Sequence, residues 1–439
     1  MKKQSIYNIW VADILYNSLS DQLIQFKNNE LESVKYFLDH LDEFETDYPE
    51  IFVKFESKGF IIESDFNEIE YILFNNRKTT LLDRHYRLTI NPTLDCNYNC
   101  WYCCVEEAGA KYERRRMDDE TVQKVRNHIQ YVIEKERINC FYFDWFGGEP
   151  LMYFYEIVYP LSKYGIELCK EKKVPCSNHI TTNAYYIDDS MIEAFKEIRV
   201  NSFQIPIDGH EKKHNSVKKM ANIGHYRKII KNINALCERI DNVNIILRIN
   251  YDENTLKTIL PLIDDIKFEN RNKISVDFQR VWQVKINKDV SGNNSLLLET
   301  IRIFENSGFK TIYFAFSPKG FACCYADNFY HRVINYDGKV FKCTARDYSD
   351  DSVIGTLNTN GSIDFKQDVI IKMFDNPTFN NEKCLKCNKL PLCYGPCIQK
   401  YYDTKIGKSR FFCLYDGSEI SIDEYIKGKA LKQMNSLYS

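Results

Sequence analysis

The chain has 439 residues, which is too long for one ordinary core and predicts two or three domains. Apolar residues make up 44% and charged residues 27%, a composition typical of globular and not of disordered proteins. Lys and Arg number 59 against 61 Asp and Glu, so the net charge of -2 excludes a nucleic-acid binder that relies on bulk positive charge. No run of about 18 apolar residues occurs, and Asn8 and Asp13 interrupt the apolar start, so we expect no membrane span, no secretory signal and a cytoplasmic location.

Cysteine usage is the unusual feature of this composition. The chain contains 16 cysteines, which without a secretory signal predict metal ligands or redox groups and not a disulfide framework. The first group is Cys96, Cys100, Cys103 and Cys104, and the second is Cys323, Cys324, Cys343, Cys384, Cys387, Cys393, Cys397 and Cys413. The remaining four, Cys140, Cys169, Cys176 and Cys237, are scattered singly and are expected to be small buried hydrophobes.

Residues 1–84 predict a small α+β module. Two short stretches rich in aromatic and β-branched residues, YNIWVA and ILYNSL, are typical of strands. Apolar residues at helical spacing predict one amphipathic helix over Glu30–Glu45. A strand over Phe60–Ile62 follows, and Asp65 is expected to cap a second helix together with Glu68.

From Tyr86 onward the pattern changes to alternating strands and helices. The best-defined helix begins behind an Asp118 cap. Six repeats predict an α/β fold with a parallel sheet, either barrel-like or doubly wound. The expected strands are Tyr86–Asn91, Cys140–Phe146, Ser177–Thr181, Ser202–Ile207, Asn244–Ile249 and Ile274–Arg280.

Polar or unusual residues follow most of these strands. Because the active sites of α/β barrels lie at the carboxyl ends of the strands, we expect one shared site there. Ordinary turn chemistry is the alternative for any one of these segments taken alone. The segments are the first cysteine group, Gly147–Pro150, Thr181–Asn183, Asp208 with Gly209, Arg248 with Asn250, and Gln279 with Arg280.

The strand–helix repeat is expected to stop near Ser307. Beyond it, glycine turns, aromatic residues and spaced cysteines predominate, which predicts a segment held together by metal. The expected domains are a module over residues 1–84, a strand–helix core over 85–306 and a cysteine-rich domain over 307–439.

The run Cys96-Asn-Tyr-Asn-Cys100-Trp-Tyr-Cys103 has a specific chemical meaning. Its three thiolates can bind three irons of a [4Fe–4S] cluster and leave the fourth iron open for a substrate or cofactor. A zinc site is the alternative, but zinc needs four ligands and the extra thiol at suitable spacing is Cys104, awkwardly placed beside Cys103.

With Tyr102 before its last cysteine and a predicted strand before its first, this run resembles the radical S-adenosylmethionine (SAM) enzyme superfamily. In that family the open iron chelates SAM, and one electron cleaves SAM to methionine and a 5′-deoxyadenosyl radical that abstracts hydrogen from substrate. The resemblance implies a partial (β/α)6 barrel, bound SAM, and a flavodoxin- or ferredoxin-type electron donor. It implies no nucleic-acid and no membrane partner.

Further motifs support the same resemblance. Gly147-Gly148-Glu149-Pro150 resembles the family motif that contacts the SAM amino group, where glycines let the backbone approach the ligand closely.

Three single residues are weaker matches. Thr182 and Asn183 resemble ribose-side contacts of the family, and Arg248 is a candidate for the SAM carboxylate or ribose. Packing or helix capping is the alternative for each. Asp208 and the glycine after it resemble a Ser/Thr-x-Asp-Gly turn, although Pro206 occupies the position of the hydroxyl residue.

The second cysteine group has a longer pattern. Its part Cys384-x2-Cys387-x5-Cys393-x3-Cys397, taken alone, is also compatible with a zinc knuckle. The complete series resembles the SPASM extension of radical SAM peptide-modifying enzymes, which implies two auxiliary [4Fe–4S] clusters and three clusters in all. By this resemblance the nearer auxiliary cluster is bound by Cys324, Cys343 and Cys397, with Cys323 as a fourth ligand or with an open iron, and the outer one by Cys384, Cys387, Cys393 and Cys413.

Residues 1–84 resemble the winged-helix-like recognition elements of peptide maturases. Such elements bind a leader peptide as an added strand at a sheet edge. A packing or dimerisation module is the alternative.

The leading hypothesis is therefore a SPASM-type radical SAM peptide maturase. It would act on a ribosomally made precursor peptide and install a thioether, carbon–carbon or carbon–oxygen crosslink. An anaerobic sulfatase maturase, which makes formylglycine, is the alternative enzyme. In that family Asp directly follows the second SPASM cysteine, whereas here Thr344 follows Cys343 and the nearest acid, the candidate catalytic base, is Asp347. A non-catalytic iron–sulfur sensor is a third hypothesis, against which the intact open-site motif argues.

Overall fold

The structure is a computed structural model. It describes residues 1–103, 105, 115–219, 225–281, 283, 293–312, 320–345, 348–375, 378–408, 413, 415 and 420–437. The chain folds into two compact units, a smaller one of residues 1–83, 314–329 and 372–439 and a larger one of residues 84–313 and 330–371. This division differs from the three consecutive segments expected from the sequence, because each unit combines stretches that lie far apart in the chain.

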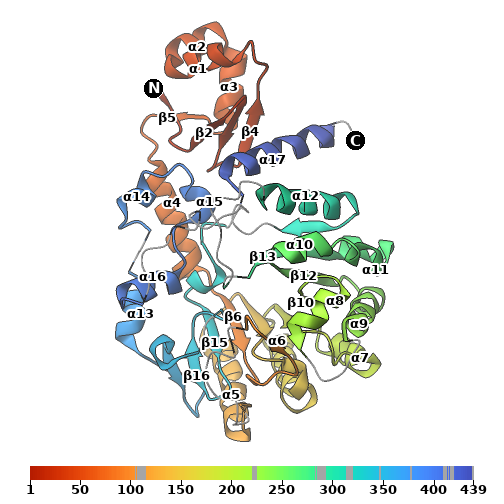
Figure 1. Ribbon diagram of the computed structural model, residues 1–439. Coiled ribbons are helices and arrows are strands. Elements are labelled where there is room, and N and C mark those ends of the chain that lie inside the picture. Colours follow the sequence, from red (N-terminus) through yellow and green to blue (C-terminus); the bar gives the residue numbers. More distant parts are fainter. Residues whose placement is uncertain are drawn as a thin grey trace. The chain divides into compact units, whose positions relative to one another are not determined.

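The larger unit is built on one sheet of eleven strands (Figure 1). The six predicted strands are all present, with ends within two residues of the expected ones. A seventh, β14, follows the helix α12, so the expectation that the repeat stops near Ser307 was wrong. With only three residues, β14 is too short to show a strand pattern in the sequence. The strands are β6 (His85–Ile90), β8 (Cys140–Trp145), β9 (Cys176–Thr181), β10 (Val200–Ile207), β12 (Asn244–Tyr251), β13 (Ile274–Arg280) and β14 (Lys310–Ile312).

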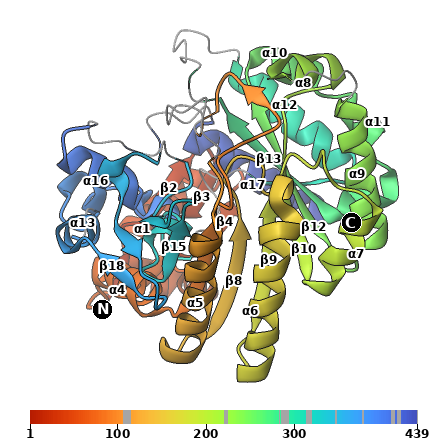
Figure 2. The ribbon, with the colours of Figure 1, turned by 90° about the horizontal axis from the view of Figure 1, so that it is seen from below.

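These strands are parallel, and helices cover one face of the sheet (Figure 2). Alternate residues of β8, among them Phe143 and Trp145, are buried against α6, where the Trp145 indole donates to the Ser162 hydroxyl at 3.0 Å. The intervening residues therefore point to the opposite face, which we call the inner face. The helices are α5 (Asp119–Lys135), α6 (Tyr159–Lys172), α7 (Asp189–Glu197), α8 (Glu211–Val217), α9 (His225–Arg239), α10 (Glu253–Thr258), α11 (Leu262–Asp265) and α12 (Asn293–Asn306).

Four short strands of the expected cysteine-rich domain continue this sheet. β15 pairs in parallel with β6, and the next three strands form an antiparallel meander beside it. His128 of α5 secures the meander, because one ring nitrogen lies 2.6 Å from the Gly361 carbonyl and the other 2.8 Å from the Tyr86 hydroxyl. The strands are β15 (His331–Ile334), β16 (Lys339–Phe341), β17 (Gly355–Leu357) and β18 (Ile363–Phe365), and α13 spans Gln367–Met373.

The smaller unit contains two small antiparallel sheets and a group of helices. The sheet β2-β3-β4 packs with α1 to α3 around buried Leu15, Leu38, Phe44, Phe52 and Phe55. The elements are β1 (Lys2–Gln4), β2 (Asn8–Val11), β3 (Ile14–Asn17), β4 (Gln22–Gln25), α1 (Leu31–Asp39), α2 (Leu41–Asp47), α3 (Pro49–Ser57), β5 (Ile61–Glu63), α4 (Glu68–Arg77), α14 (Glu382–Leu385), α15 (Leu390–Cys393), α16 (Ile398–Lys405) and α17 (Ile422–Leu437).

Two expectations for this segment were wrong. The helix over Glu30–Glu45 is two helices, because His40 leaves the helical conformation at φ -127° and ψ 66°. The second helix is capped by Asn67 and not by Asp65, since the Asn67 side chain accepts from two backbone N–H groups of the first turn. Glu68 is buried, and its carboxylate accepts from the Ser5 hydroxyl and the Ile6 N–H instead of closing a capping box.

The N-terminal segment and the cysteine-bearing C-terminal segment share one core. Tyr7 and Ile72 pack with Leu390 and Tyr394, and all four are buried. The Ser18 hydroxyl donates to the Asn388 carbonyl at 2.5 Å. Residues 1–83 therefore form part of the scaffold that carries the late cysteines.

Candidate functional site

The loop after β6 places the first cysteine group at the carboxyl ends of the parallel strands. Backbone bonds fix its first residues against the end of β8: the Gly148 N–H donates to the Thr93 carbonyl at 3.0 Å and the Glu149 N–H donates to the Asp95 carbonyl at 2.9 Å. Asp95 immediately precedes Cys96. The position of the first cysteine is thereby set by the Gly147–Pro150 motif.

Both glycines of that motif are required by close packing. Gly147 has φ +108°, and a Cβ there would lie 2.2 Å from the Thr93 carbonyl oxygen. A Cβ on Gly148 would lie 2.1 Å from the Asp95 carbonyl oxygen. The expected approach of this backbone to a ligand stays a prediction, while the structure shows its approach to the Cys96 loop.

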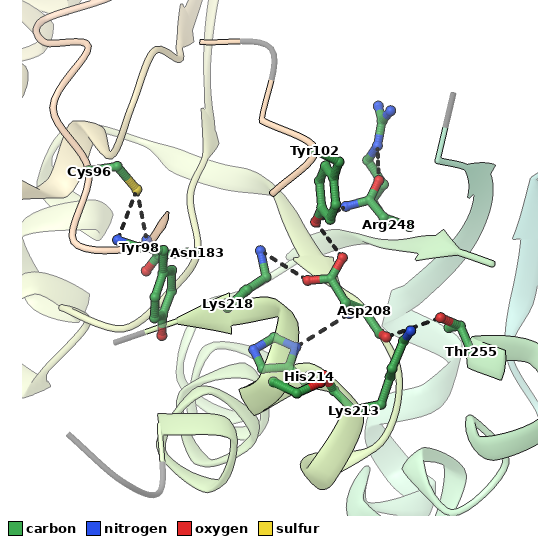
Figure 3. Close-up of polar contacts among 12 residues, drawn as sticks. Cys96, Tyr98, Tyr102, Asn183, Asp208, Lys213, His214, Lys218, Arg248 and Thr255 are labelled. Atoms are coloured by element: carbon green, nitrogen blue, oxygen red, sulfur yellow. Dashed lines mark hydrogen bonds and ion pairs between the residues drawn. The ribbon is translucent and has the colours of Figure 1, made fainter. Parts of the chain in front are cut away.

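The three cysteines of the loop fit a cluster with one open iron. None forms a disulfide, and each is at least partly exposed. The Tyr98 N–H and the Asn183 amide point to the Cys96 sulfur at 3.4 and 3.9 Å, as donors that stabilise a cluster thiolate do (Figure 3). Among the described residues no three His, Cys, Asp or Glu side chains are gathered around a single ion position. Thiolates that bind different irons of one cluster are not expected to gather in that way.

Glu149 is buried and connects the ends of β8 and β9. Its carboxylate accepts from the Thr182 hydroxyl at 2.7 Å, the Asn183 N–H at 2.8 Å and the Leu151 N–H at 3.0 Å. Burial raises the pKa of Glu149 to about 7 against these stabilising bonds. Glu149 and Thr182, predicted to contact the cofactor, thus contact each other.

Asn183 links this network to the cysteine loop. Its side-chain amide donates to the side-chain oxygen of Asn97 at 2.7 Å and also faces the Cys96 sulfur. Three strand ends predicted to share a site therefore meet in the structure. Whether Asn183 also contacts the cofactor stays a prediction.

A second polar network ties Tyr102, between Cys100 and Cys103, to the ends of β10 and β12 (Figure 3). The Tyr102 hydroxyl donates to the Asp208 carboxylate, and it accepts from the Asn250 amide at 3.0 Å. The Lys218 ammonium lies 3.4 Å from the other Asp208 oxygen. This network holds the cysteine loop at Tyr102, whereas Gly148 packs against it at Asp95.

The ion pair in this network is buried. The Lys218 and Asp208 side chains are 4% and 2% exposed. Burial, the largest single effect, acts to lower the Lys218 pKa, but Asp208 together with Tyr102, Cys100 and Cys96 outweighs it and the pKa is raised. Lys218 belongs to a short strand, β11 (Lys218–Lys219), that pairs with β7 (Asn99–Cys100) of the cysteine loop. Sequence reasoning missed Lys218, because its partners become neighbours only through this pairing of residues far apart in the chain.

Arg248 lies at the margin of the network. Its guanidinium donates to the Asn250 side-chain oxygen at 3.1 Å, and Asn250 in turn contacts Tyr102. Arg248 is thus connected to the cysteine loop through one intermediate, and its predicted contact with the SAM carboxylate or ribose stays a prediction.

The inner face of the sheet carries a row of polar residues that sequence reasoning also missed. Thr89, Asp144, His179 and Ser202 lie opposite one another on four adjacent strands. The Thr89 hydroxyl donates to Asp144 at 3.0 Å, and the His179 ring lies 2.8 Å from the Ser202 hydroxyl. The alternation of polar and apolar residues in β9 and β10 was the available signal.

The late cysteines of the smaller unit fall into two neighbourhoods. Burial raises the pKa of Cys384 to about 11, and Cys413 and Cys387 contribute, so these three thiols lie near one another. The Asp327 carboxylate accepts from the Cys324 N–H at 2.9 Å and the Ile398 N–H at 3.0 Å. It therefore holds the Cys324 segment beside the start of α16, which directly follows Cys397.

Three other predicted ligands are placed by the elements that carry them. Cys323 is buried directly beside Cys324, and Cys393 ends α15. Cys343 follows β16 in the larger unit. Asp347, the candidate base, lies outside the described residues.

Comparisons with known proteins agree with this geometry. Residues 90–266 match a family model described as the Radical SAM superfamily. The solved structure of anSMEcpe with bound AdoMet is 19% identical, and the match covers 81% of this chain and 95% of that chain with a TM-score of 0.58. A structure of anSMEcpe with bound AdoMet and Cp18Cys peptide is 20% identical over 80% and 99% of the two chains, with a TM-score of 0.57.

A third similar structure is Streptococcus suis SuiB bound to S-adenosylmethionine. It is 18% identical, and the match covers 91% of this chain and 96% of that chain with a TM-score of 0.51. Identities this low show a shared fold. No curated protein matches the chain.

The matched segment runs from the last residue of β6 through the three cysteines and the ends of β8, β9, β10 and β12. Residues 90–266 therefore form a radical SAM domain, and the protein is a radical SAM enzyme. Its cofactors are a [4Fe–4S] cluster and SAM. None of the helices in the described part of the chain has the length and apolar character needed to span a membrane.

Proposed function

We propose that the protein is a radical SAM peptide maturase that crosslinks a ribosomally made precursor peptide in the cytoplasm, using three [4Fe–4S] clusters and a flavodoxin- or ferredoxin-type electron donor. The observation that supports this proposal most directly is the three-cysteine loop held between Gly148 and Asp208. When bound, the cluster and SAM supply a 5′-deoxyadenosyl radical that abstracts hydrogen from the substrate. The auxiliary clusters are assigned to the late cysteines by resemblance.

The residues of the site have separable tasks. Gly147 and Gly148 allow the Cys96 loop to sit against the end of β8, and Glu149 fixes Thr182 and Asn183 beside it. Asp208 and Lys218 hold Tyr102, so the loop is fixed on both flanks. A loop fixed in this way would hold a bound cluster in one place at the carboxyl ends of the strands.

The experiment removes the three ligands together. Replacing Cys96, Cys100 and Cys103 by Ala should abolish 5′-deoxyadenosine formation under dithionite, while the iron of the two auxiliary clusters is retained. The matched control is Cys237→Ser, a buried cysteine of α9. Persisting SAM cleavage in the triple variant would refute the site. Iron and sulfide near four per protein in the wild type, with bound zinc, would refute the auxiliary clusters.

Sulfatase maturation is the second candidate. The anSMEcpe match supports it, since anSMEcpe is an anaerobic sulfatase maturase. The SuiB match covers more of this chain, 91% against 81%, and Thr344 stands where sulfatase maturases are expected to have Asp. A peptide encoded beside this gene and a Cys-containing sulfatase peptide distinguish the two. Loss of two hydrogens in the former supports crosslinking, and an aldehyde in the latter supports formylglycine formation.

For substrate recognition we propose the free edge of β4. In the described part of the chain β4 pairs with β3 alone, so its other edge is available for an added peptide strand. The Phe26 N–H donates to the Asp13 carbonyl of the adjoining hairpin, and alternation therefore turns the Gln25 N–H outward.

Gln25→Pro removes this outward donor, whereas Gln25→Ala keeps it. Proline is tolerated on an edge strand where the N–H faces away from the sheet. We expect Gln25→Pro to weaken leader-peptide affinity in fluorescence anisotropy about tenfold, with uncoupled SAM cleavage unchanged. Equal affinities for both variants would leave residues 1–84 as a packing or dimerisation element.

A further inference from the structure

A buried positive charge lies against the loop that carries the three cysteines. The Lys218 side chain is 4% exposed, and its ammonium lies 3.4 Å from the Asp208 carboxylate. The same ammonium lies over the Tyr98 ring, 5.7 Å from the ring centroid (Figure 3). Asp208 in turn accepts from the Tyr102 hydroxyl. The ammonium is thus next to one tyrosine of the loop directly and is connected to the other through Asp208.

These contacts place the charge beside the cysteines themselves. Tyr98 lies between the first and second cysteines of the loop, and Tyr102 lies between the second and third. The Tyr98 N–H points to the Cys96 sulfur at 3.4 Å. The backbone of Lys218 pairs with Cys100 through the short strands β11 and β7. Lys218 is therefore anchored at the middle one of the three predicted ligands.

The ion pair is fixed in position by the strand end that carries it. The Asp208 N–H donates to a His214 ring nitrogen at 3.3 Å, and the Asp208 carbonyl accepts from the Thr255 hydroxyl at 3.3 Å. An ammonium beside a carboxylate keeps its charge, and salt screens a buried charge only weakly. Lys218 is therefore a fixed positive charge next to the loop.

Two other charged features lie at the opposite end of the loop. The Arg115 guanidinium lies 3.7 Å from the Asp95 carboxylate, directly before Cys96. The buried Glu149 carboxylate accepts from residues that follow β8 and β9. Both features are anchored at the Cys96 end, so the charge at Lys218 can be changed without removing the bonds that hold that end.

The reduction potential of an iron–sulfur cluster depends on the charges around it. Uptake of one electron makes the cluster more negative, so a nearby buried cation favours the reduced form. Asp208 opposes this effect, but its carboxylate is also engaged by the Tyr102 hydroxyl, whereas Lys218 belongs to the strand that pairs with Cys100.

We propose that the Lys218 ammonium raises the reduction potential of the SAM cluster and thereby eases the electron uptake that precedes SAM cleavage. One electron passes from an external one-electron reductant to the oxidised cluster. Lys218 keeps its proton, and no covalent bond forms or breaks in this step. The inference needs the SAM cluster alone and does not depend on the identity of the substrate.

The test is a redox titration of the anaerobically reconstituted holoenzyme with dithionite, followed by electron paramagnetic resonance. SAM is left out, so that a contact between Lys218 and SAM cannot contribute. The signal of the SAM cluster is the part that disappears when Cys96, Cys100 and Cys103 are replaced by Ala. Any signal that remains in that variant serves as an internal reference and should keep its potential in all other variants.

Lys218→Met removes the charge and keeps a side chain of similar length. One unit charge about 12 Å away, at an effective dielectric constant of about 20, changes an equilibrium about tenfold. We therefore expect the ratio of reduced to oxidised cluster at a given potential to fall about tenfold, which corresponds to about 59 mV for one electron. Lys218→Arg, which keeps the charge, should retain the wild-type potential.

Two further variants separate this effect from packing and from overall charge. The double variant Lys218→Met, Asp208→Asn should have a potential between those of Lys218→Met and the wild type. It buries no unpaired charge, so it is the test if Lys218→Met fails to bind the cluster. The matched control is Lys213→Met in α8, which breaks a half-buried ion pair with Asp252 (2.6 Å) and should leave the potential unchanged.

Three results would overturn the proposal. An unchanged potential in Lys218→Met, or in the double variant if the single one lacks the cluster, would show that the charge does not act on the cluster, even if SAM binding is weakened. An equal shift in Lys218→Arg would assign the effect to packing. An equal shift in Lys213→Met would assign it to the overall charge of the protein.

Discussion

Gly148→Ala tests the claim that the Gly147–Pro150 motif positions the cysteine loop. The added Cβ would lie 2.1 Å from the Asp95 carbonyl oxygen and 2.6 Å from the Leu94 carbonyl oxygen. Such contacts require at least about 3 Å, so the loop must move by roughly 1 Å. The displaced atoms are backbone, which cannot rotate away as a flexible side chain would.

The cost follows from this displacement. Overpacking of a fixed site costs about 1–3 kcal/mol. Weakening the bond from the Glu149 N–H to the Asp95 carbonyl adds about 1 kcal/mol. We therefore expect the free energy of unfolding of the cluster-free protein to fall by about 2–4 kcal/mol. Because Asp95 precedes Cys96, the SAM cluster should also be lost.

The assays separate these two effects. Urea unfolding of the cluster-free protein measures the destabilisation, and iron content with electron paramagnetic resonance after anaerobic reconstitution measures the cluster. Gly428→Ala in α17 is the matched control, since no atom lies within 4 Å of its added Cβ, and it should stabilise the protein by up to about 1 kcal/mol. A Gly148→Ala protein with full cluster signal and an unchanged urea midpoint would refute the reasoning.

Two further predictions concern buried charges in the larger unit. Lys218→Met leaves the Asp208 carboxylate buried without its ammonium partner, so it should lower the free energy of unfolding by about 3 kcal/mol or more in the urea assay. The double variant Lys218→Met, Asp208→Asn should recover part of this lost stability. Equal losses in the single and double variants would contradict a coupled pair. Burial lowers the pKa of His128 from 6.5 to about 4 in the folded protein. As the pH falls, the unfolded chain therefore binds the extra proton at a higher pH than the folded protein does. The free energy of unfolding should fall by about 3 kcal/mol between about pH 6.5 and pH 4. His128→Gln should remove this pH-dependent component, and an unchanged pH profile would contradict the assignment.

Sequence reasoning succeeded where one physical signal controlled the outcome. The six predicted strands are all present. In runs such as Ile274–Arg280, apolar residues either alternate with polar ones or form a continuous buried stretch, and turn residues bound each run. The structure places the cysteines of the predicted cluster loop at the carboxyl ends of the strands, and their role as cluster ligands stays a prediction. The helix cap at Asp118 was also correct, and its carboxylate accepts from the Thr121 N–H at 2.8 Å.

The failures share a different cause. Helical periodicity continues across His40, so the break between α1 and α2 left no mark in the pattern of apolar residues. Lys218 gains its role through pairing with Cys100, which depends on the complete fold. Contacts between elements, not propensities within them, decided each of these cases.

The shared core of the smaller unit decides how peptide recognition has to be tested. Removing residues 1–84 would also remove Tyr7, which packs against Leu390 and Tyr394 beside the late cysteines. It would remove Ser18, whose hydroxyl bonds the Asn388 carbonyl just after Cys387. A truncated protein would lose peptide affinity whether or not its N-terminal segment binds peptide, because two of the four buried residues in this core, Tyr7 and Ile72, would be removed. Gln25→Pro alters one outward N–H and leaves that core intact, so a loss of affinity in this variant alone identifies a strand edge that reads the substrate backbone.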